Sequence, residues 1–166
     1  MSRWPGQEEW RMNKTNAMRL LDRAGIPYET LEYEADENNL AGVHVAEQIG
    51  IPVRQVFKTL VARGEKKGIM VFCIPAAEEI NLKKAAAAVG DKKIEMVHVK
   101  ELPGLTGYIR GGCSPVGMKK KYPVYFDESI RDQEEITISA GVRGCQLKLK
   151  ARALTDYIGA EICSLT

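Results

Sequence analysis

A glycine-rich segment, residues 107–117, holds the residue types that could most clearly do chemistry. Four glycines, Tyr108 and the pair Ser114–Pro115 lie within eleven residues, and three lysines follow at 119–121. Glycine lets the backbone approach a ligand closely, and proline fixes the local φ angle. Such a segment can direct several N–H groups at an anion or a carbonyl oxygen. Glycine and proline clusters also mark ordinary turns, so a tight turn between two strands is the alternative interpretation.

Lys58 is the second feature, because it interrupts an otherwise apolar strand sequence, Val56–Val61. Strand alternation places Lys58 and Leu60 on one face, and Phe57 and Thr59 on the other. Sharing a face with leucine favours a half-buried lysine that could contact a phosphate or a substrate carbonyl. A lysine at a sheet edge that extends its amine to solvent is the alternative.

A second glycine-containing turn spans Ser139–Gly144. Arg143 within it could bind a phosphate through two parallel hydrogen bonds. A β-hairpin with an exposed arginine explains the same residues and, from this segment alone, is the favoured interpretation.

The sequence contains no recognisable pairing of a nucleophile with a base. Ser114 precedes proline rather than standing in a GxSxG elbow, and neither His44 nor His98 lies in a triad context. The glycine segment lacks the GK[ST] ending of a phosphate-binding loop, and the four cysteines form no CxxC pair. We therefore expect no metal and no cofactor, and a site built from backbone amides and a lysine.

Helical and strand patterns alternate along the chain, but several strands follow one another with only a turn between them. This order excludes a purely parallel, doubly wound sheet and predicts the mixed α/β (α+β) class, with a mixed, barrel-like β-sheet flanked by several helices. Helices are expected at 17–24, 43–49, 82–89 and 154–158, and strands at 28–33, 56–63, 69–74, 95–99, 124–126, 136–139 and 146–149.

The chain has 166 residues, of which 45% are hydrophobic, as expected for one compact domain. We assign that domain to residues 13–166 and residues 1–12 to an N-terminal extension. No apolar run is long enough for a membrane helix and no signal peptide is recognisable, so a cytoplasmic protein with reduced cysteines is expected. The net charge of +2 is too small to indicate nucleic-acid binding, although clustered lysines could face a phosphate backbone.

Taken together, the motifs resemble the YbaK/EbsC family of aminoacyl-tRNA deacylases, which is related to the editing domain of bacterial prolyl-tRNA synthetase. The resemblance runs from about Lys14 to Leu165, and each motif is weak alone but specific in this order. The matching segments are Phe57–Leu60, Leu82–Ala86, Lys92–Met96, Gly107–Gly117 and Ser139–Gly144.

The resemblance implies removal of a wrongly attached amino acid from tRNA, with cysteine on tRNA(Pro) as the first expectation. Family members are thought to use no protein nucleophile, and in cysteine-specific members the thiol of the substrate is proposed to attack the ester. Lys58 matches the family's functional lysine, thought to hold the acceptor end of the substrate. Tyr33 falls at a pocket tyrosine, and the substrate-pocket loop matches at Gly111, Gly112, Ser114 and Pro115.

These inferences define an expected site. Lys58, Gly111 and Gly112 are the expected catalytic groups, and Lys119 and Lys120 are expected to contact tRNA. The expected substrate-binding residues are Tyr33, Phe57, Thr59, Gly107, Tyr108, Ser114, Pro115, Gly141 and Arg143.

Mischarged tRNA is the expected partner, prolyl-tRNA synthetase is a candidate second partner, and the oligomeric state stays open. Ala140, Cys113 and Gln146 depart from common family residues, which leaves amino-acid selectivity open. A deacylase for Ala-tRNA(Pro) and a non-catalytic module that binds tRNA or a synthetase are the alternatives.

Overall fold

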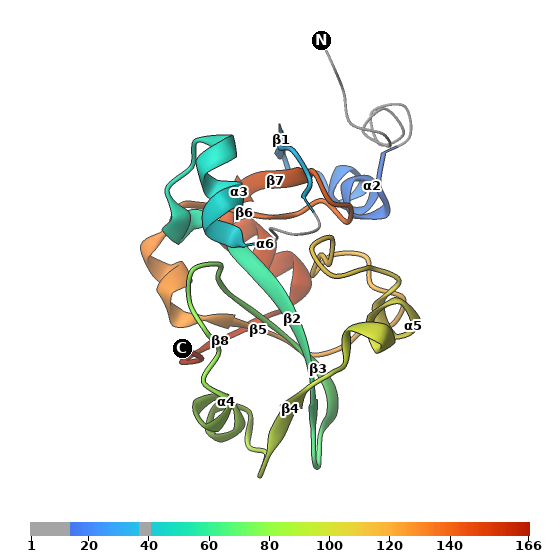
Figure 1. The fold of residues 1–166 in the computed structure, drawn as a ribbon, viewed down its shortest axis with the longest axis vertical. Coiled ribbons are helices and arrows are strands. Elements are labelled where there is room, and N and C mark those ends of the chain that lie inside the picture. The colour runs from blue at the N-terminus through green and yellow to red at the C-terminus, as the bar shows by residue number, and fades with distance from the viewer. Residues whose placement is uncertain (1–13, 37–40) are drawn as a thin grey trace.

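Two β-sheets form the frame of the protein, shown by a computed structural model that describes residues 14–36 and 41–166 (Figure 1). The larger sheet has the strand order β4-β2-β3-β5-β8, and the smaller has the order β1-β7-β6. The expected extension, residues 1–12, lies outside the described residues. The strands are β1 (Glu29–Glu32), β2 (Phe57–Gly64), β3 (Gly68–Pro75), β4 (Ile94–Met96), β5 (Val124–Asp127), β6 (Glu135–Ser139), β7 (Cys145–Lys150) and β8 (Glu161–Cys163).

The larger sheet is mixed, as the sequence predicted. β2 and β3 form an antiparallel hairpin, whereas β3 and β5, and β5 and β8, pair in parallel. β3 lies between β2 and β5, and its residues from Met70 onward are buried. A strand covered on both faces reads as a continuous apolar run, which is why the sequence 69–74 lacks alternation.

A single parallel bridge joins the two sheets, between Val56 and Thr137. The sheets therefore meet along β2 and β6 and curve around a shared core. Within the described residues the strands form two sheets and do not close into a barrel. The predicted barrel-like sheet therefore corresponds only to the curvature of these two sheets.

The helices lie outside the sheets (Figure 1). They are α2 (Asn16–Arg23), α3 (Gly42–Ile49), α4 (Leu82–Val89), α5 (Leu102–Thr106) and α6 (Ala151–Ile158), with 3-10 turns η1 (Val53–Gln55), η2 (Val99–Glu101) and η3 (Glu128–Asp132). The Thr15 hydroxyl accepts from the Met18 amide and Asn81 Oδ1 accepts from the Lys84 amide, so a side-chain cap begins both α2 and α4.

Two short elements were not predicted, α5 and β8, and α6 begins three residues earlier than expected. α5 has five residues and β8 has three, which is too short for hydrophobic periodicity to show. No helix in the described part of the chain is long and apolar enough to cross a membrane.

The main core fills the space between the two sheets. Fully buried side chains from β5, β6 and β7 meet there, and the Phe57 and Phe126 ring centroids lie 6.1 Å apart. A second cluster lies beneath α4, where Phe72 stacks on Tyr125. Truncating such a side chain to alanine typically costs about 2–5 kcal/mol, so these clusters hold the strands in place around the site.

Candidate functional site: a cavity at an open strand edge

β2 changes partners along its length, and this change creates the site. Its start is bridged to β6 at Val56, whereas β4 pairs only with Ala62–Gly64. The Val97 amide donates to the Val61 carbonyl, so the backbone groups of odd-numbered residues face this edge of β2. The N–H and C=O groups of Thr59 therefore face a gap between β4 and β6.

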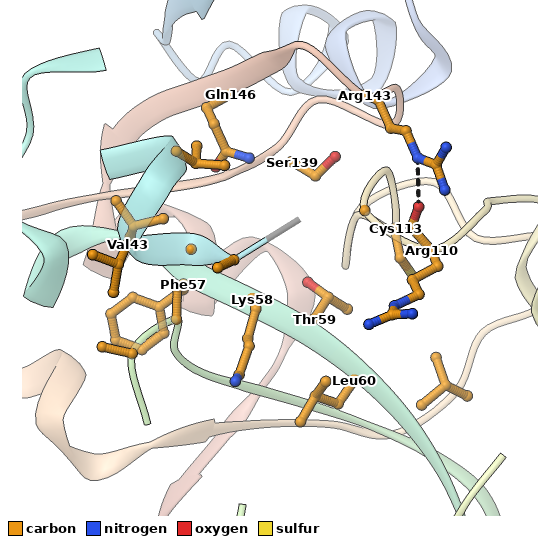
Figure 2. A pocket seen from close by; sticks show the side chains of 18 of the residues that line it. Val43, Phe57, Lys58, Thr59, Leu60, Arg110, Cys113, Ser139, Arg143 and Gln146 are labelled. Atoms are coloured by element: carbon orange, nitrogen blue, oxygen red, sulfur yellow. Dashed lines mark hydrogen bonds between the residues drawn. The ribbon is translucent and has the colours of Figure 1, made fainter. Parts of the chain in front are cut away.

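A cavity of about 720 Å³ occupies this gap. Its walls come from β2, from α3, from the chain around η2, from the turn at Arg110–Gly111, and from β6 and β7 (Figure 2). Val43, Met96 and Val99 form an apolar rim, being between 39% and 54% exposed. The volume falls in the range of about 300–1,000 Å³ that is usual for small-molecule sites.

Lys58 lies half-buried on the floor of the cavity, as the sequence favoured. In Figure 2 its side chain extends from β2, alongside Thr59 and Leu60. Among residues 14–36 and 41–166, no hydrogen bond or ion pair holds its Nζ atom. A cation without a protein partner in a cavity is free to bind an anionic or carbonyl group of a ligand.

The turn Ile109–Gly112 forms a second wall and departs from the prediction. The Gly112 amide donates to the Ile109 carbonyl at 2.9 Å, so it is not the bare donor expected from the sequence. Gly111 has a φ of 84°, as the third residue of a type II turn requires. A Cβ atom on Gly112 would lie 3.2 Å from the Val142–Arg143 backbone, so close packing is what this glycine provides.

Arg143 fastens this turn. Its Nε atom donates to the Arg110 carbonyl at 2.8 Å (Figure 2). Because the peptide is planar and trans, the Gly111 N–H points in the opposite direction, away from Arg143. Among the described residues the Gly111 N–H has no hydrogen-bond partner, so it is the amide of the predicted pair that stays available.

A polar wall faces β2 from the smaller sheet. Ser139 and Gln146 are cross-strand neighbours, 7% and 6% exposed, and both line the cavity with Tyr33. The Ser139 hydroxyl accepts from the Gly141 amide at 3.1 Å. Within the described chain, the buried Oε1 atom of Gln146 has no hydrogen-bond partner. A buried acceptor without a partner is costly, which is typical of a group held ready for a ligand.

Burial raises the pKa of Tyr33, although hydrogen bonds from the Gly144 backbone and the Gln146 side chain oppose this shift. The phenol is therefore neutral near pH 7. It offers a hydroxyl group to the cavity rather than a charge.

The cavity thiol is poorly suited to act as a nucleophile. Burial raises the pKa of Cys113 to about 11, against a hydrogen bond with Thr106 that lowers it. Burial also raises the pKa of Cys73, whose Sγ atom lies 3.7 Å from the Thr59 hydroxyl. Thiolate rather than thiol attacks carbonyl carbons, so these buried cysteines provide packing.

The structure separates the expected site residues into two groups. Those that line the cavity are Tyr33, Phe57, Lys58, Thr59, Gly111 and Arg143. Phe57 is only 2% exposed and is mainly part of the core. The remaining expected residues do not line it, namely Gly107, Tyr108, Gly112, Ser114, Pro115, Gly141, Lys119 and Lys120.

Several residues of this second group stabilise the loop 107–117 through hydrogen bonds outside the cavity. The Tyr108 hydroxyl donates to the Val116 carbonyl at 2.6 Å, and the Ser114 hydroxyl accepts from the Val116 amide. Burial raises the pKa of Tyr108 to about 12, with the nearby Cys113 adding to the shift. Lys119 and Lys120 are exposed and lie outside the cavity.

Sequence reasoning missed most of the apolar lining and three charged groups, Asp36, Glu79 and Arg110. Ser139, Gln146 and Cys113 were noted but not assigned to the site. Met96 and Val99 carry no local signal, since only the fold brings η2 next to β2. The described residues contain no cluster of three or more histidine, cysteine or acidic side chains that could hold a metal ion.

The fold places a cavity of small-molecule size beside an open strand edge, and among the described residues no activated nucleophile lines it. A family model described as an aminoacyl-tRNA editing domain matches residues 40–157. The chain belongs to this family, and its predicted resemblance to YbaK/EbsC proteins is confirmed.

Named relatives agree with this membership. The chain is 44% identical to EbsC of Enterococcus faecalis, named as a candidate Cys-tRNA(Pro)/Cys-tRNA(Cys) deacylase, over 92% of this chain and 93% of that protein. It is 27% identical to the proline–tRNA ligase of Cupriavidus necator over 80% of this chain, which corresponds to 24% of the ligase.

Solved structures share the fold. One is described as a candidate trans-editing enzyme for prolyl-tRNA synthetase, with a TM-score of 0.78, 24% identity and coverage of 99% of both chains. Another, the protein APE2540, has a TM-score of 0.82 and 18% identity, over 91% of this chain and 99% of that one.

Proposed function

We propose that this protein is a trans-editing aminoacyl-tRNA deacylase that removes cysteine from Cys-tRNA(Pro). The carrying observation is a cavity that pairs an available lysine amine with an available backbone N–H. Lys58 lies on its floor and Gly111 on its wall, and no activated nucleophile accompanies them in the described part of the chain. Membership in the editing family supports the ester of a mischarged tRNA as the substrate.

The geometry supports electrostatic catalysis of ester cleavage. Lys58 would hold the acceptor end and polarise the ester carbonyl, while the Gly111 N–H would stabilise the developing oxyanion. The cysteinyl thiolate of the substrate would attack its own carbonyl carbon. The carbon–oxygen bond to the ribose then breaks, the ribose oxygen takes a proton, and water hydrolyses the released cyclic thioester.

The proposed reaction and the deacylation of Ala-tRNA(Pro) differ in the amino acid that is removed. Alanine has no thiol, so hydrolysis of Ala-tRNA(Pro) would require a bound water as the nucleophile. The cavity excludes neither side chain by size, since one small group in an apolar pocket is worth only about 1–3 kcal/mol. The thiol of the substrate is the feature that favours cysteine.

The proposal includes its partners and setting. Exposed Lys119 and Lys120 would contact phosphates of the acceptor stem. The affinity for tRNA should therefore fall as the salt concentration rises. Prolyl-tRNA synthetase would present the mischarged tRNA, and the reaction would take place in the cytoplasm with translation.

The test is a deacylation panel with Cys-tRNA(Pro), Ala-tRNA(Pro) and Pro-tRNA(Pro), each compared with buffer alone. We expect rapid loss of cysteine, slower loss of alanine and no loss of proline. Binding of tRNA without any hydrolysis would instead identify a non-catalytic module. Faster loss of alanine than of cysteine would reverse the assigned preference.

A further inference from the structure

Arg110 is a basic group of the cavity that no sequence motif singled out. It lines the cavity together with Lys58, at a separate wall. In the part of the chain that the structure describes, its guanidinium group makes no hydrogen bond and no ion pair. Figure 2 shows the side chain extending from the loop toward the side formed by Thr59 and Leu60.

The backbone that carries Arg110 is held by two hydrogen bonds and by close packing. The turn is closed by the bond from the Gly112 amide to Ile109, and the Arg110 carbonyl accepts from Arg143 Nε. Gly112 also packs tightly on the Val142–Arg143 backbone. The guanidinium is thus presented from a rigid base, which reduces the entropy lost when it binds a ligand.

Charge is distributed unevenly around the cavity. Arg110 and Arg143 lie on one side, whereas the carboxylates Asp36 and Glu79 line it elsewhere. Both carboxylates lie near α3. The chain before Asp36 is hydrogen-bonded to α3 through Glu34 and Gln48, and Glu79 follows Ala76, which packs against Gly42.

We propose that Arg110 binds the phosphate on the 5′ side of the terminal nucleotide of the substrate. This inference rests on the proposed function. An aminoacylated tRNA end has an anionic phosphodiester at one side and the α-ammonium group of the amino acid at the other. The polarised cavity would bind it in one orientation, with phosphate at Arg110, ammonium toward Asp36 and Glu79, and the ester near Lys58.

The discriminating experiment compares two non-hydrolysable ligands that differ only in this phosphate. These are an adenosine that carries cysteine through a 3′-amide bond, with and without a 5′-phosphate. We expect the wild-type protein to bind the phosphorylated ligand about tenfold more tightly at low salt, as for a charge-assisted contact. Arg110→Ala should abolish this difference while leaving binding of the unphosphorylated ligand unchanged.

The variant is suited to this question because it removes only the side chain. The Arg110 carbonyl, and therefore the bond from Arg143, is kept in Arg110→Ala. Arg110→Lys should restore part of the preference for phosphate. Arg152→Ala is the matched control, since Arg152 is exposed on α6 and forms only a weak pair with Asp156.

Equal affinity of the wild-type protein for both ligands would overturn the inference, as would an Arg110→Ala variant that keeps the preference. A parallel loss for both ligands would assign Arg110 to the loop structure and also contradict it. Free inorganic phosphate serves as a competitor, and equal competition in wild type and variant would place the phosphate elsewhere. Because binding is measured without turnover, failure of the deacylation panel remains a separate result.

Discussion

The Nε atom of Arg143 lies 2.8 Å from the carbonyl oxygen of Arg110, 33 residues earlier in the chain, and donates a hydrogen bond to it. This bond connects the two glycine-containing segments of the sequence. It fixes the peptide that carries the Gly111 N–H and the base from which Arg110 extends. Arg143 therefore acts on the site mainly through the backbone of another loop.

Removing the hydrogen bond from Arg143 should make the turn at Arg110–Gly111 more mobile. We expect Arg143→Ala to lower kcat/KM for the mischarged tRNA about tenfold, because a hydrogen bond of about 0.5–1.5 kcal/mol is lost where the oxyanion donor is positioned. Hydrogen exchange at the Gly112 amide should become faster in the variant. Unchanged exchange would mean that close packing alone holds the turn.

Lys58 should be essential for catalysis but not for folding. Because no protein group among the described residues pairs with its amine, Lys58→Ala should change the free energy of unfolding by less than about 0.5 kcal/mol. Deacylation should fall at least about 100-fold, as for loss of a group that stabilises developing charge. Lys83→Ala on the exposed face of α4 is the control, and an active Lys58→Ala enzyme would remove the role given to this lysine.

Gln146 should matter more for binding than for stability. Gln146→Leu removes a buried acceptor that has no partner among the described residues, but also the hydrogen bond to Tyr33, so the free energy of unfolding should change by less than about 1 kcal/mol. Affinity for the cysteinyl-adenosine amide should fall. Urea denaturation and ligand titration of the same preparation test both expectations. A variant that is less stable and binds normally would show that the amide is structural.

Asp127 should make stability depend on pH. Burial alone would raise its pKa, but hydrogen bonds from Ser129, Leu165 and Thr166 outweigh burial and hold the pKa below the ordinary value of 3.8. The folded state therefore binds its proton less tightly than the unfolded state does. The stabilisation is present above about pH 4 and is lost as pH falls through the lowered pKa.

The comparison of interest is wild type with Asp127→Asn. The variant should be less stable by about 1–3 kcal/mol at neutral pH, because a charged acceptor of buried donors is lost. The difference should shrink as the pH is lowered toward 3. Exposed Asp132→Asn is the control and should show no such trend in urea denaturation. A constant difference across this range would contradict the assignment to the carboxylate.

The amino-acid sequence by itself determined most of the elements, the mixed sheet and the family. Strand alternation, helix caps and glycine stops are local signals, so β2, β3, α3 and α4 were predicted close to their observed bounds. Lys58 stood out for the same reason, as a charge within an apolar strand. α5 and β8 were missed because they are too short to show a period.

Only the tertiary structure decided which groups share the cavity. The site exists because β4 and β6 leave β2 at different points, and no local pattern specifies where strands diverge. That divergence brings Met96, Val99, Ser139 and Gln146 into one cavity with Lys58. The folded loop also directs the Tyr108 and Ser114 hydroxyls to the backbone of Val116 and pairs the Gly112 amide with the Ile109 carbonyl. Spacing along a chain determines local conformation, whereas the direction of a side chain or amide depends on packing between distant segments.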